Sequence, residues 1–260
     1  MPGLVRTETE GHLGWIVFDH PERRNAISAH MWEAIPDAAA ALDADPEVRV
    51  VVMRGAGDVA FVSGADISEF ENTRTGPHAE EYDRGNARAF TALANLSKPL
   101  IALIHGFCVG GGCALSLTAD FRYAAEDAVF AIPAARLGLG YSAAGLEALV
   151  NVVGYAYAKE IFFTARRFSA ADALQMGLVN RVLAKTELEG YVRQVAGDIA
   201  ANAPLTVGSA KLSLRELMKP LAARDDAAVA EAIRACYASA DYAEGVRAFL
   251  EKRKPQFRGK

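Results

Sequence analysis

The chain has 260 residues, of which 52% are hydrophobic, and its formal net charge is −4. This length and apolar content predict a globular fold with a large core and exclude a disordered chain. The negative charge argues against nucleic acid or an anionic membrane as a partner, so any anionic ligand must be held locally.

The cysteine and histidine content predicts a compartment and argues against a metal. Three cysteines, an odd number without metal-ligand spacing, are typical of a reducing compartment. The N-terminal residues contain no apolar signal core, and no apolar run approaches the length of a membrane span. The five histidines form no ligand pair, so no metal site is expected. We therefore expect a cytoplasmic protein.

The first quarter of the chain predicts two strands with a helix between them. Residues 14–19 form the first strand, and residues 48–54 are the clearest strand pattern in the chain. Ser28 can cap the intervening helix, which Pro36 should kink or split.

The segment 98–120 organises the rest of the chain. Residues 100–104 are a short run of branched apolar residues, typical of a strand buried on both faces. Gly106 allows a sharp turn, and Gly110–Gly112 precede a helical pattern. Backbone amides at such a helix start can bind an anion or an oxyanion, whereas tight packing of helix on strand is an equally open explanation.

A second glycine-bearing turn, Gly64–Ala65, also stands before a predicted helix start. Two separate N–H donors that converge on one carbonyl oxygen would make an oxyanion hole. Asp66 and Glu69 follow this turn, where helix capping is the expected role and acid–base work the alternative.

The remainder of the chain changes from strands to helices. Residues 121–125 and 128–132 are two more short strands, residues 133–145 are a loop, and a helical pattern follows almost to the end. Capping-box signatures occur at Ser169–Asp172, Thr186–Glu189 and Asp241–Glu244. We therefore predict an α/β domain over residues 1–195 and a helical region over residues 196–260.

One motif suggests a different chemistry. Residues 106–110 read G-F-C-V-G, a thiol version of the nucleophile elbow, after a strand and before a helix. A Cys108 nucleophile is therefore one hypothesis, although a buried structural cysteine is the commoner role.

The chain resembles the enoyl-CoA hydratase/isomerase (crotonase) superfamily nearly from end to end. The segments that carry the resemblance are P-E-R-R-N-A-I at 21–27, F-V-S-G-A-D-I-S-E-F at 61–70, K-P-L-I-A-L-I-H-G-F-C-V-G-G-G at 98–112 and F-T-A-R-R-F-S-A-A-D-A-L-Q-M-G-L-V-N-R-V at 163–182. The resemblance implies a spiral of stacked ββα turns, a helical trimerisation region, and trimers or dimers of trimers. It also implies an acyl-CoA thioester as substrate and an enolate intermediate, with no cofactor beyond the substrate's own coenzyme A.

The same resemblance assigns the site. The N–H groups of Ala65 and Gly111 match the two oxyanion donors. The Ser63 carbonyl matches the acceptor of the adenine amino group, and Arg24 matches a basic residue that meets CoA phosphate or pantetheine. Phe249 and Lys252 match the C-terminal residues that touch the nucleotide across a subunit interface. The other residues expected to bind CoA are Ala26, Asp66 and Ile67.

The chain departs from the hydratases at their two glutamates. Ala114 and Ala134 stand at those positions. Hydration needs a carboxylate pair to deprotonate water and protonate the α-carbon, and alanine can do neither. We therefore predict a poor hydratase.

Residues 137–146 resemble the segment of methylmalonyl-CoA decarboxylases that places a tyrosine near the thioester, and Tyr141 falls on that position. Those enzymes use a histidine where this chain has Ala65. Arg136 could pair with a substrate carboxylate and Tyr141 could orient it or donate a proton, with a surface ion pair and a packed ring as the ordinary roles. Three hypotheses follow: a lyase, decarboxylase or isomerase acting on acyl-CoA, an acyl-CoA-binding protein without turnover, and the Cys108 hydrolase.

Overall fold

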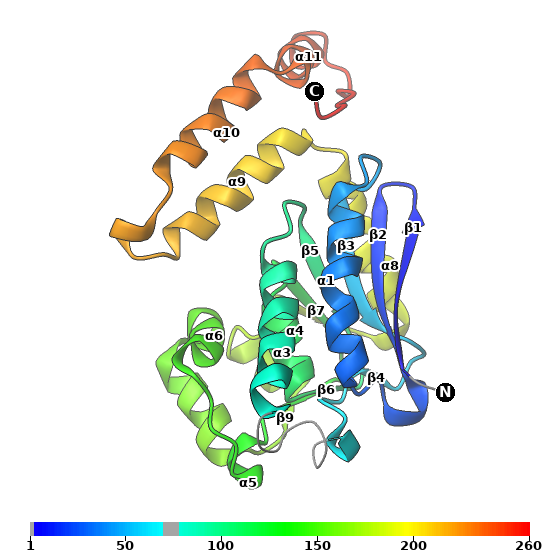
Figure 1. Ribbon diagram of the computed structural model, residues 1–260. Helices are drawn as coiled ribbons and strands as arrows, with labels where there is room; N and C mark the ends of the chain where they lie inside the picture. The colour runs from blue at the N-terminus through cyan, green and yellow to red at the C-terminus, as the bar shows by residue number, and fades with distance from the viewer. Residues whose placement is uncertain (1–2, 70–77) are drawn as a thin grey trace.

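The computed structural model describes residues 3–69 and 78–260, and its strands form two sheets (Figure 1). In the larger sheet, a β1–β2 hairpin is followed by parallel strands. Its strands, in spatial order, are β1 (Leu4–Glu10), β2 (Leu13–Asp19), β3 (Val50–Gly55), β5 (Leu100–Ile104), β7 (Phe121–Ala125) and β10 (Arg181–Leu183). The smaller sheet has the order β4 (Ala60–Val62), β6 (Phe107–Val109), β8 (Val129–Ala131) and β9 (Phe168–Ser169).

The two sheets are built together along the chain. Strand β3 is followed by β4, β5 by β6, and β7 by β8, so each turn of the chain adds one strand to each sheet. Helices follow these pairs, which gives the repeating strand–strand–helix spiral that the resemblance predicts. Parallel neighbours in both sheets bring the ends of β4 and β6 to the same edge.

The helices lie around and beyond this spiral (Figure 1). The helices of the main body are α1 (Ala29–Ala44), α3 (His78–Ala94), α4 (Gly111–Leu117), α5 (Ala134–Leu137), α6 (Ala143–Thr164), α7 (Ala170–Gln175) and α8 (Lys185–Ala200), with short 3₁₀ turns at η1 (Pro21–Arg23) and η2 (Ile67–Glu69). The C-terminal arm consists of α9 (Pro204–Leu217), η3 (Leu221–Ala223), α10 (Asp226–Ala238) and α11 (Ala240–Leu250).

Both faces of the larger sheet are buried along β2, β3, β5 and β7, as their continuous apolar runs require, whereas the edge strand β1 is exposed. Along β3, Val50 and Val52 face a cluster that contains Leu188 and Val192 of α8. The intervening Val51 belongs to the larger core shared with α1, α3 and α4. Because successive side chains of a strand point to opposite faces, a strand without polar residues needs such cover on both sides.

A buried arginine lies just after the C-terminal end of α4 and binds backbone carbonyls. Arg122 is 7% exposed; its Nε donates to the Leu178 carbonyl at 2.8 Å and its Nη1 to the Ala119 carbonyl at 2.6 Å. Burial lowers the pKa of Arg122, and the charge of the nearby Asp120 opposes this. The cation sits at the end of α4, where helix carbonyls lack intrahelical partners. It therefore fixes α4, and with it the glycines at its start.

The structure confirms most of the predicted elements. The strands predicted at 100–104 and 121–125 have those bounds as β5 and β7, and Ser28 caps α1 with its side chain. The capping box at Ser169–Asp172 is present at the start of α7. The predicted boundary after residue 195 falls inside α8.

Several expectations were wrong. The loop predicted at 133–145 contains α5, and the pattern missed β1 and β6. Pro36 does not split α1. Helix α8 begins at Lys185 after Ala184, and α11 is capped by Ser239, so the two later capping boxes do not form. Asp241 instead accepts hydrogen bonds from the backbone of the C-terminal tail, because its position faces that tail.

The C-terminal arm extends away from the two sheets (Figure 1). Its tail is fastened back by Glu244, which accepts from both Nη atoms of Arg253 and from the backbone of Gln256. The hydrogen bonds from Arg253 lower the pKa of Glu244 to about 2. Over the described residues, every helix is too short or too polar to cross a bilayer.

One buried histidine lies where β5 ends. His105 is 6% exposed, and its Nε2 has no hydrogen-bond partner among the described residues. Burial lowers the pKa of His105, the charge of Lys185 acts in the same direction, and Asp127 opposes both. The folded chain therefore favours a neutral imidazole at this position.

This histidine predicts acid sensitivity. Its pKa is lower in the folded than in the unfolded chain, so below about 6.5, the ordinary value, the unfolded state binds more protons and stability falls as pH falls. In His105→Gln, the free energy of unfolding from urea titrations should decline less between about pH 7 and pH 5. His30→Gln, at an exposed position of α1, is the matched control. The same flattening in the control, or none at His105, would contradict the assignment.

Candidate functional site

The two glycine-bearing turns meet at the ends of β4 and β6. Strands β4 and β6 are parallel neighbours, and each runs directly into one of the turns. Gly64 has φ +121° and Gly110 has φ +54°, conformations that L-residues with side chains rarely adopt. A side-chain carbon added to Gly111 would lie 3.6 Å from the Ala65 nitrogen. The structure therefore brings the predicted donor residues, Ala65 and Gly111, side by side.

The backbone N–H groups at this meeting point differ in whether they have a hydrogen-bond acceptor. Asp66 N–H donates to the Ile27 carbonyl at 2.9 Å, and Gly110 N–H donates to the Ala131 carbonyl at 2.8 Å. For Ala65 and Gly111, in contrast, no acceptor occurs among residues 3–69 and 78–260. Both are only partly buried, so both N–H groups are available to an oxygen of a ligand.

An aromatic wall stands beside Gly111. The ring of Trp32, on α1, lies 3.2 Å from where a side-chain carbon of Gly111 would be. Its indole N–H donates to the Tyr82 hydroxyl of α3 at 3.1 Å, and the Phe90 ring packs edge-on against it at 5.4 Å. Sequence reasoning missed this wall, because an aromatic residue on a helix reads equally well as ordinary core.

The alanines at the hydratase glutamate positions lie on α4 and α5. Ala114 is half-buried in the first turn of α4, and Ala134 is 2% exposed as the first residue of α5. A side chain longer than alanine at position 134 would therefore enter a packed region.

The carboxylates of Asp66 and Glu69 both accept hydrogen bonds from other groups of the chain. The Asp66 carboxylate accepts from the Ser68 backbone at 3.0 Å and from the Ser68 hydroxyl at 2.6 Å. Burial raises the pKa of Asp66, but the hydrogen bonds from Ser68 and the charge of Arg23 outweigh it, and the net shift is downward. Glu69 accepts from the Ala29 N–H at 2.8 Å, at the start of α1. Both carboxylates thus act as caps, which favours that role over acid–base work.

The predicted CoA-binding residues divide into two groups, one beside the Gly64–Ala65 turn and one at the end of the C-terminal arm. Ser63 and Arg24 are adjacent, since the Ser63 N–H donates to the Arg24 carbonyl at 3.1 Å. The Arg24 guanidinium lies 4.7 Å from the centre of the Phe107 ring, and Arg167, which the sequence reasoning missed, lies 5.9 Å from the same ring. Nothing in the sequence distinguishes Arg167 from an ordinary surface arginine.

Two further predicted residues, Ala26 and Ile67, flank this group, together with Asn25, which was not predicted. Ala26 is buried, and its carbonyl lies 3.0 Å from Nδ1 of His20. Ile67 is 59% exposed beside the Gly64–Ala65 turn, an unusual position for a large apolar side chain. Asn25 fixes the whole turn, because its side chain joins the His20 N–H to the Ala60 carbonyl.

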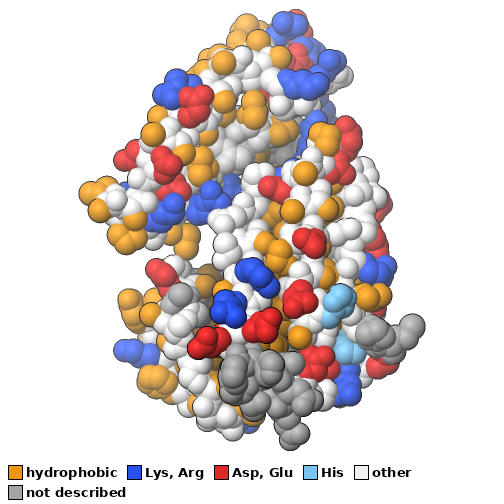
Figure 2. Space-filling view, in the orientation of Figure 1, with side chains coloured by type: hydrophobic (Ala, Val, Ile, Leu, Met, Phe, Trp, Pro, Cys, Tyr) orange, Lys and Arg blue, Asp and Glu red, His pale blue; other side chains and the backbone are white. Residues whose placement is uncertain are grey.

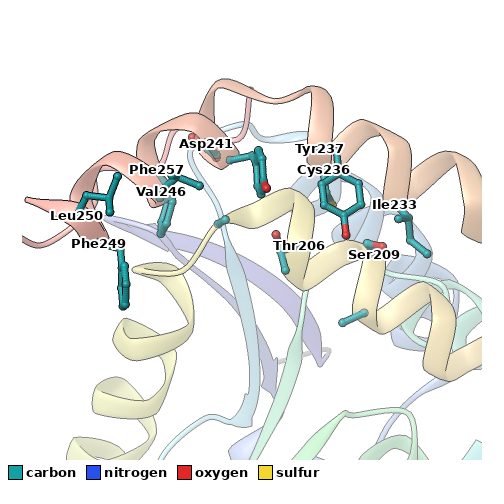
Figure 3. A pocket seen from close by; sticks show the side chains of 14 residues that line it. Thr206, Ser209, Ile233, Cys236, Tyr237, Asp241, Val246, Phe249, Leu250 and Phe257 are labelled. Atoms are coloured by element: carbon teal, nitrogen blue, oxygen red, sulfur yellow. The ribbon is translucent and has the colours of Figure 1, made fainter.

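Phe249 and Lys252 lie at the other end of the molecule, on and just after α11 (Figure 1). Phe249 is 84% exposed. Within one chain the structure does not bring them to the glycine turns. Phe249 lines a groove between α9, α10 and α11, as Figure 3 shows. The volume of this groove is about 730 Å³.

Arg136 and Tyr141 belong to the α5–α6 region. Arg136 is exposed in the last turn of α5. Tyr141 is 36% exposed and packs edge-on against Phe162 of α6 at 4.7 Å. This packing holds the Tyr141 ring.

The Cys108 hypothesis is wrong. The Cys108 side chain is fully buried in β6. Burial raises the pKa of its thiol well above the ordinary value, and the neighbouring Cys113 adds to the effect. A nucleophilic cysteine needs the thiolate and access to a substrate, and this one has neither.

The chain thus combines a strand–strand–helix spiral with two adjoining glycine turns. Comparison with known proteins shows which class of protein shares its sequence and fold. The family model for enoyl-CoA hydratase/isomerase matches residues 8–260. The chain is 36% identical over 250 residues to a crotonyl-CoA hydratase of Syntrophomonas wolfei, covering 96% of each chain. It is 34% identical to a peroxisomal Delta(3,5)-Delta(2,4)-dienoyl-CoA isomerase of Arabidopsis thaliana, covering 98% of this chain and 95% of that one.

Among solved structures, an enoyl-CoA hydratase/carnithine racemase from Magnetospirillum magneticum superposes with a TM-score of 0.94 at 33% identity. The match covers 99% of this chain and 96% of that one. The chain therefore belongs to the enoyl-CoA hydratase/isomerase family. The names of these relatives include hydratases and an isomerase, so membership does not select one reaction.

The contact between the turns predicts one intolerant glycine. A side-chain carbon on Gly112 would lie 2.1 Å from the Val62 carbonyl oxygen, so α4 and β4 would have to separate. Gly112→Ala should lower the free energy of unfolding by roughly 1–3 kcal/mol, measured by urea denaturation. Gly197→Ala, on exposed α8 with open space around it, should be neutral or stabilising by up to about 1 kcal/mol. Equal effects of the two substitutions would contradict this account.

Proposed function

We propose that this chain binds an acyl-CoA thioester and stabilises the enolate of its acyl group with the Ala65 and Gly111 N–H groups. The observation that carries the proposal is the position of these two amides in adjoining turns, with no acceptor in the described part of the chain. An enolate places negative charge on the thioester oxygen, and removing one preorganised donor from such an oxygen typically costs about 3 kcal/mol. Family membership supports the choice of a CoA thioester.

CoA itself would lie along Ser63 and Arg24. The Ser63 carbonyl accepts no hydrogen bond from the described residues, which leaves it free for the adenine amino group. Arg24 and Arg167 both lie close to the Phe107 ring, and their two positive charges favour the phosphates of CoA. Coenzyme A enters as part of the substrate, and we propose no separate cofactor.

The reaction would not be efficient hydration. A carboxylate pair at positions 114 and 134 is replaced by alanine, and the nearby Asp66 and Glu69 are held as caps. Loss of a general acid–base group typically lowers the rate about 10²–10⁴-fold. We favour a lyase or isomerase reaction that uses the amide pair without a carboxylate pair. A decarboxylation assisted by Tyr141 and Arg136 is one example. Binding without turnover is the second candidate, which the absence of these carboxylates also favours.

A thioester panel tests the reaction. Hydration of crotonyl-CoA should be slower than the roughly 10 per second of an ordinary enzyme. A malonyl-type thioester should be decarboxylated, and Tyr141→Phe should lower that rate at least about tenfold. Tyr155→Phe, at a 73% exposed position of α6, is the matched control and should not change it.

The outcomes separate the candidates. Fast crotonyl-CoA hydration would overturn the proposed deficit. Calorimetric binding of the thioesters with no turnover would replace the lyase by a binding protein, and no binding at all would overturn the thioester proposal. Adding both carboxylates, as Ala114→Glu with Ala134→Glu, should raise hydration by about 10²-fold if the packed surroundings of Ala134 admit the longer side chain, and no gain would mean that the pocket geometry also differs.

We further propose that the chain acts as a trimer or a dimer of trimers in the cytoplasm. Hydrophobic side chains gather over the C-terminal arm, as Figure 2 shows. Its apolar side chains that are at least 60% exposed are Leu214, Leu217, Met218, Leu221, Tyr237, Phe249 and Leu250. An exposed apolar surface of this kind marks a protein interface. A second copy docked here could also bring Phe249 and Lys252 to the CoA of its neighbour. The cysteines, all unpaired in the described residues, support a reducing compartment.

A charge placed in this surface should break the assembly. Phe249→Asp should convert the oligomer to monomer, measured by light scattering or sedimentation, because a buried unpaired carboxylate is strongly unfavourable. Leu4→Asp, at a 47% exposed position of the distant strand β1, should leave the mass unchanged. A wild-type monomer, or an unchanged mass for Phe249→Asp, would contradict the proposed interface.

A further inference from the structure

Helix α3 has one polar residue in an otherwise apolar buried stripe. The stripe repeats at helical spacing and faces the core: Tyr82, Gly85, Ala89, Phe90 and Leu93. Asn86 lies within it, one turn after Tyr82 and one turn before Phe90. Side chains three and four residues apart share one face of a helix, so Asn86 shares theirs.

The oxygen of this side chain is buried without a partner. Asn86 Oδ1 is shielded from solvent and accepts no hydrogen bond within the described structure. A buried polar atom left unsatisfied is unfavourable by about 1–3 kcal/mol, and such atoms are rare in folded proteins. An apolar residue of similar size would fill the position without this penalty. Among the described residues this acceptor therefore remains open to a donor from a ligand.

Asn86 lies on the side of α3 that packs against Trp32, the aromatic residue beside Gly111. Its neighbours along the stripe, Tyr82 and Phe90, both contact Trp32. The Trp32 ring in turn lies 3.2 Å from where a side-chain carbon of Gly111 would be. One aromatic residue thus links this face of α3 to the oxyanion turn, which places Asn86 in the wall of the proposed acyl site.

We propose that Asn86 determines specificity by accepting a hydrogen bond from a hydroxyl group on the acyl chain of the thioester. This rests on the proposed thioester site and adds the class of acyl group that it takes. An amide oxygen only accepts, so a substrate carboxylate or carbonyl cannot satisfy it, whereas a hydroxyl can. The carboxylates of Asp66 and Glu69, which follow the Gly64–Ala65 turn, already accept from Ser68 and Ala29, whereas Asn86 Oδ1 accepts from none of the described residues.

Calorimetry with matched ligands tests the proposal. The ligands are butyryl-CoA and its 2-, 3- and 4-hydroxy derivatives, so that the preferred derivative also locates the hydroxyl along the chain. The wild-type protein should bind one hydroxylated ligand about fivefold to tenfold more tightly than butyryl-CoA. Asn86→Leu, close in size and apolar, should lose this preference and bind no hydroxylated ligand more tightly than butyryl-CoA. Asn95→Leu, an exposed residue just after α3, is the matched control and should keep the preference.

Each other result counts against the inference. A wild-type protein that binds butyryl-CoA but prefers no hydroxylated derivative overturns the role of Asn86 and leaves the thioester site standing. No binding of any of these thioesters overturns both. If Asn86→Leu does not fold, Asn86→Ser replaces it; retention of the full preference in a folded variant without the amide, or an equal loss of affinity for all four ligands, also overturns the proposal.

Discussion

The structure depends on the close approach of two backbone turns across the β4–β6 pair. Gly112 has no side chain because the Val62 carbonyl oxygen occupies the space, and Gly64 and Gly110 adopt backbone conformations that side chains disfavour. The spiral makes the contact possible, since it adds β4 and β6 as parallel neighbours that end at one edge. What results is a pair of amides whose position is set by strands and by α4, which Arg122 anchors from its other end.

Main-chain donors hold their position at little entropic cost, and they suit a family whose members carry out different reactions. The amides can stabilise one kind of intermediate, while side chains around them select what happens next. In this chain Trp32 and Tyr82 form a wall beside Gly111, and alanines stand at positions 114 and 134, where the resemblance predicts the glutamates of hydratases. The chemistry we propose follows from that combination, with Asn86 as the polar group that reads the acyl chain.

Local patterns predicted most of the fold because burial imposes them directly. A run such as Leu100–Ile104 has no polar residue to place at a surface, so a strand covered on both faces is the consistent solution. Strand β6 was missed because three residues between glycines carry too little pattern. The capping box predicted at Asp241 failed because that carboxylate is captured by the C-terminal tail, a partner distant in sequence.

By itself, the sequence determined most of the strands and helices, the glycines of both turns, the family resemblance and the alanines at positions 114 and 134. These are local properties of residue type and spacing. Only the tertiary structure decided that the Ala65 and Gly111 amides adjoin, that Cys108 is buried in the core, and that the buried Asn86 oxygen has no donor among residues 3–69 and 78–260. Each depends on which distant segments pack together, because exclusion from water and hydrogen-bond partnership are set by the folded surroundings of an atom.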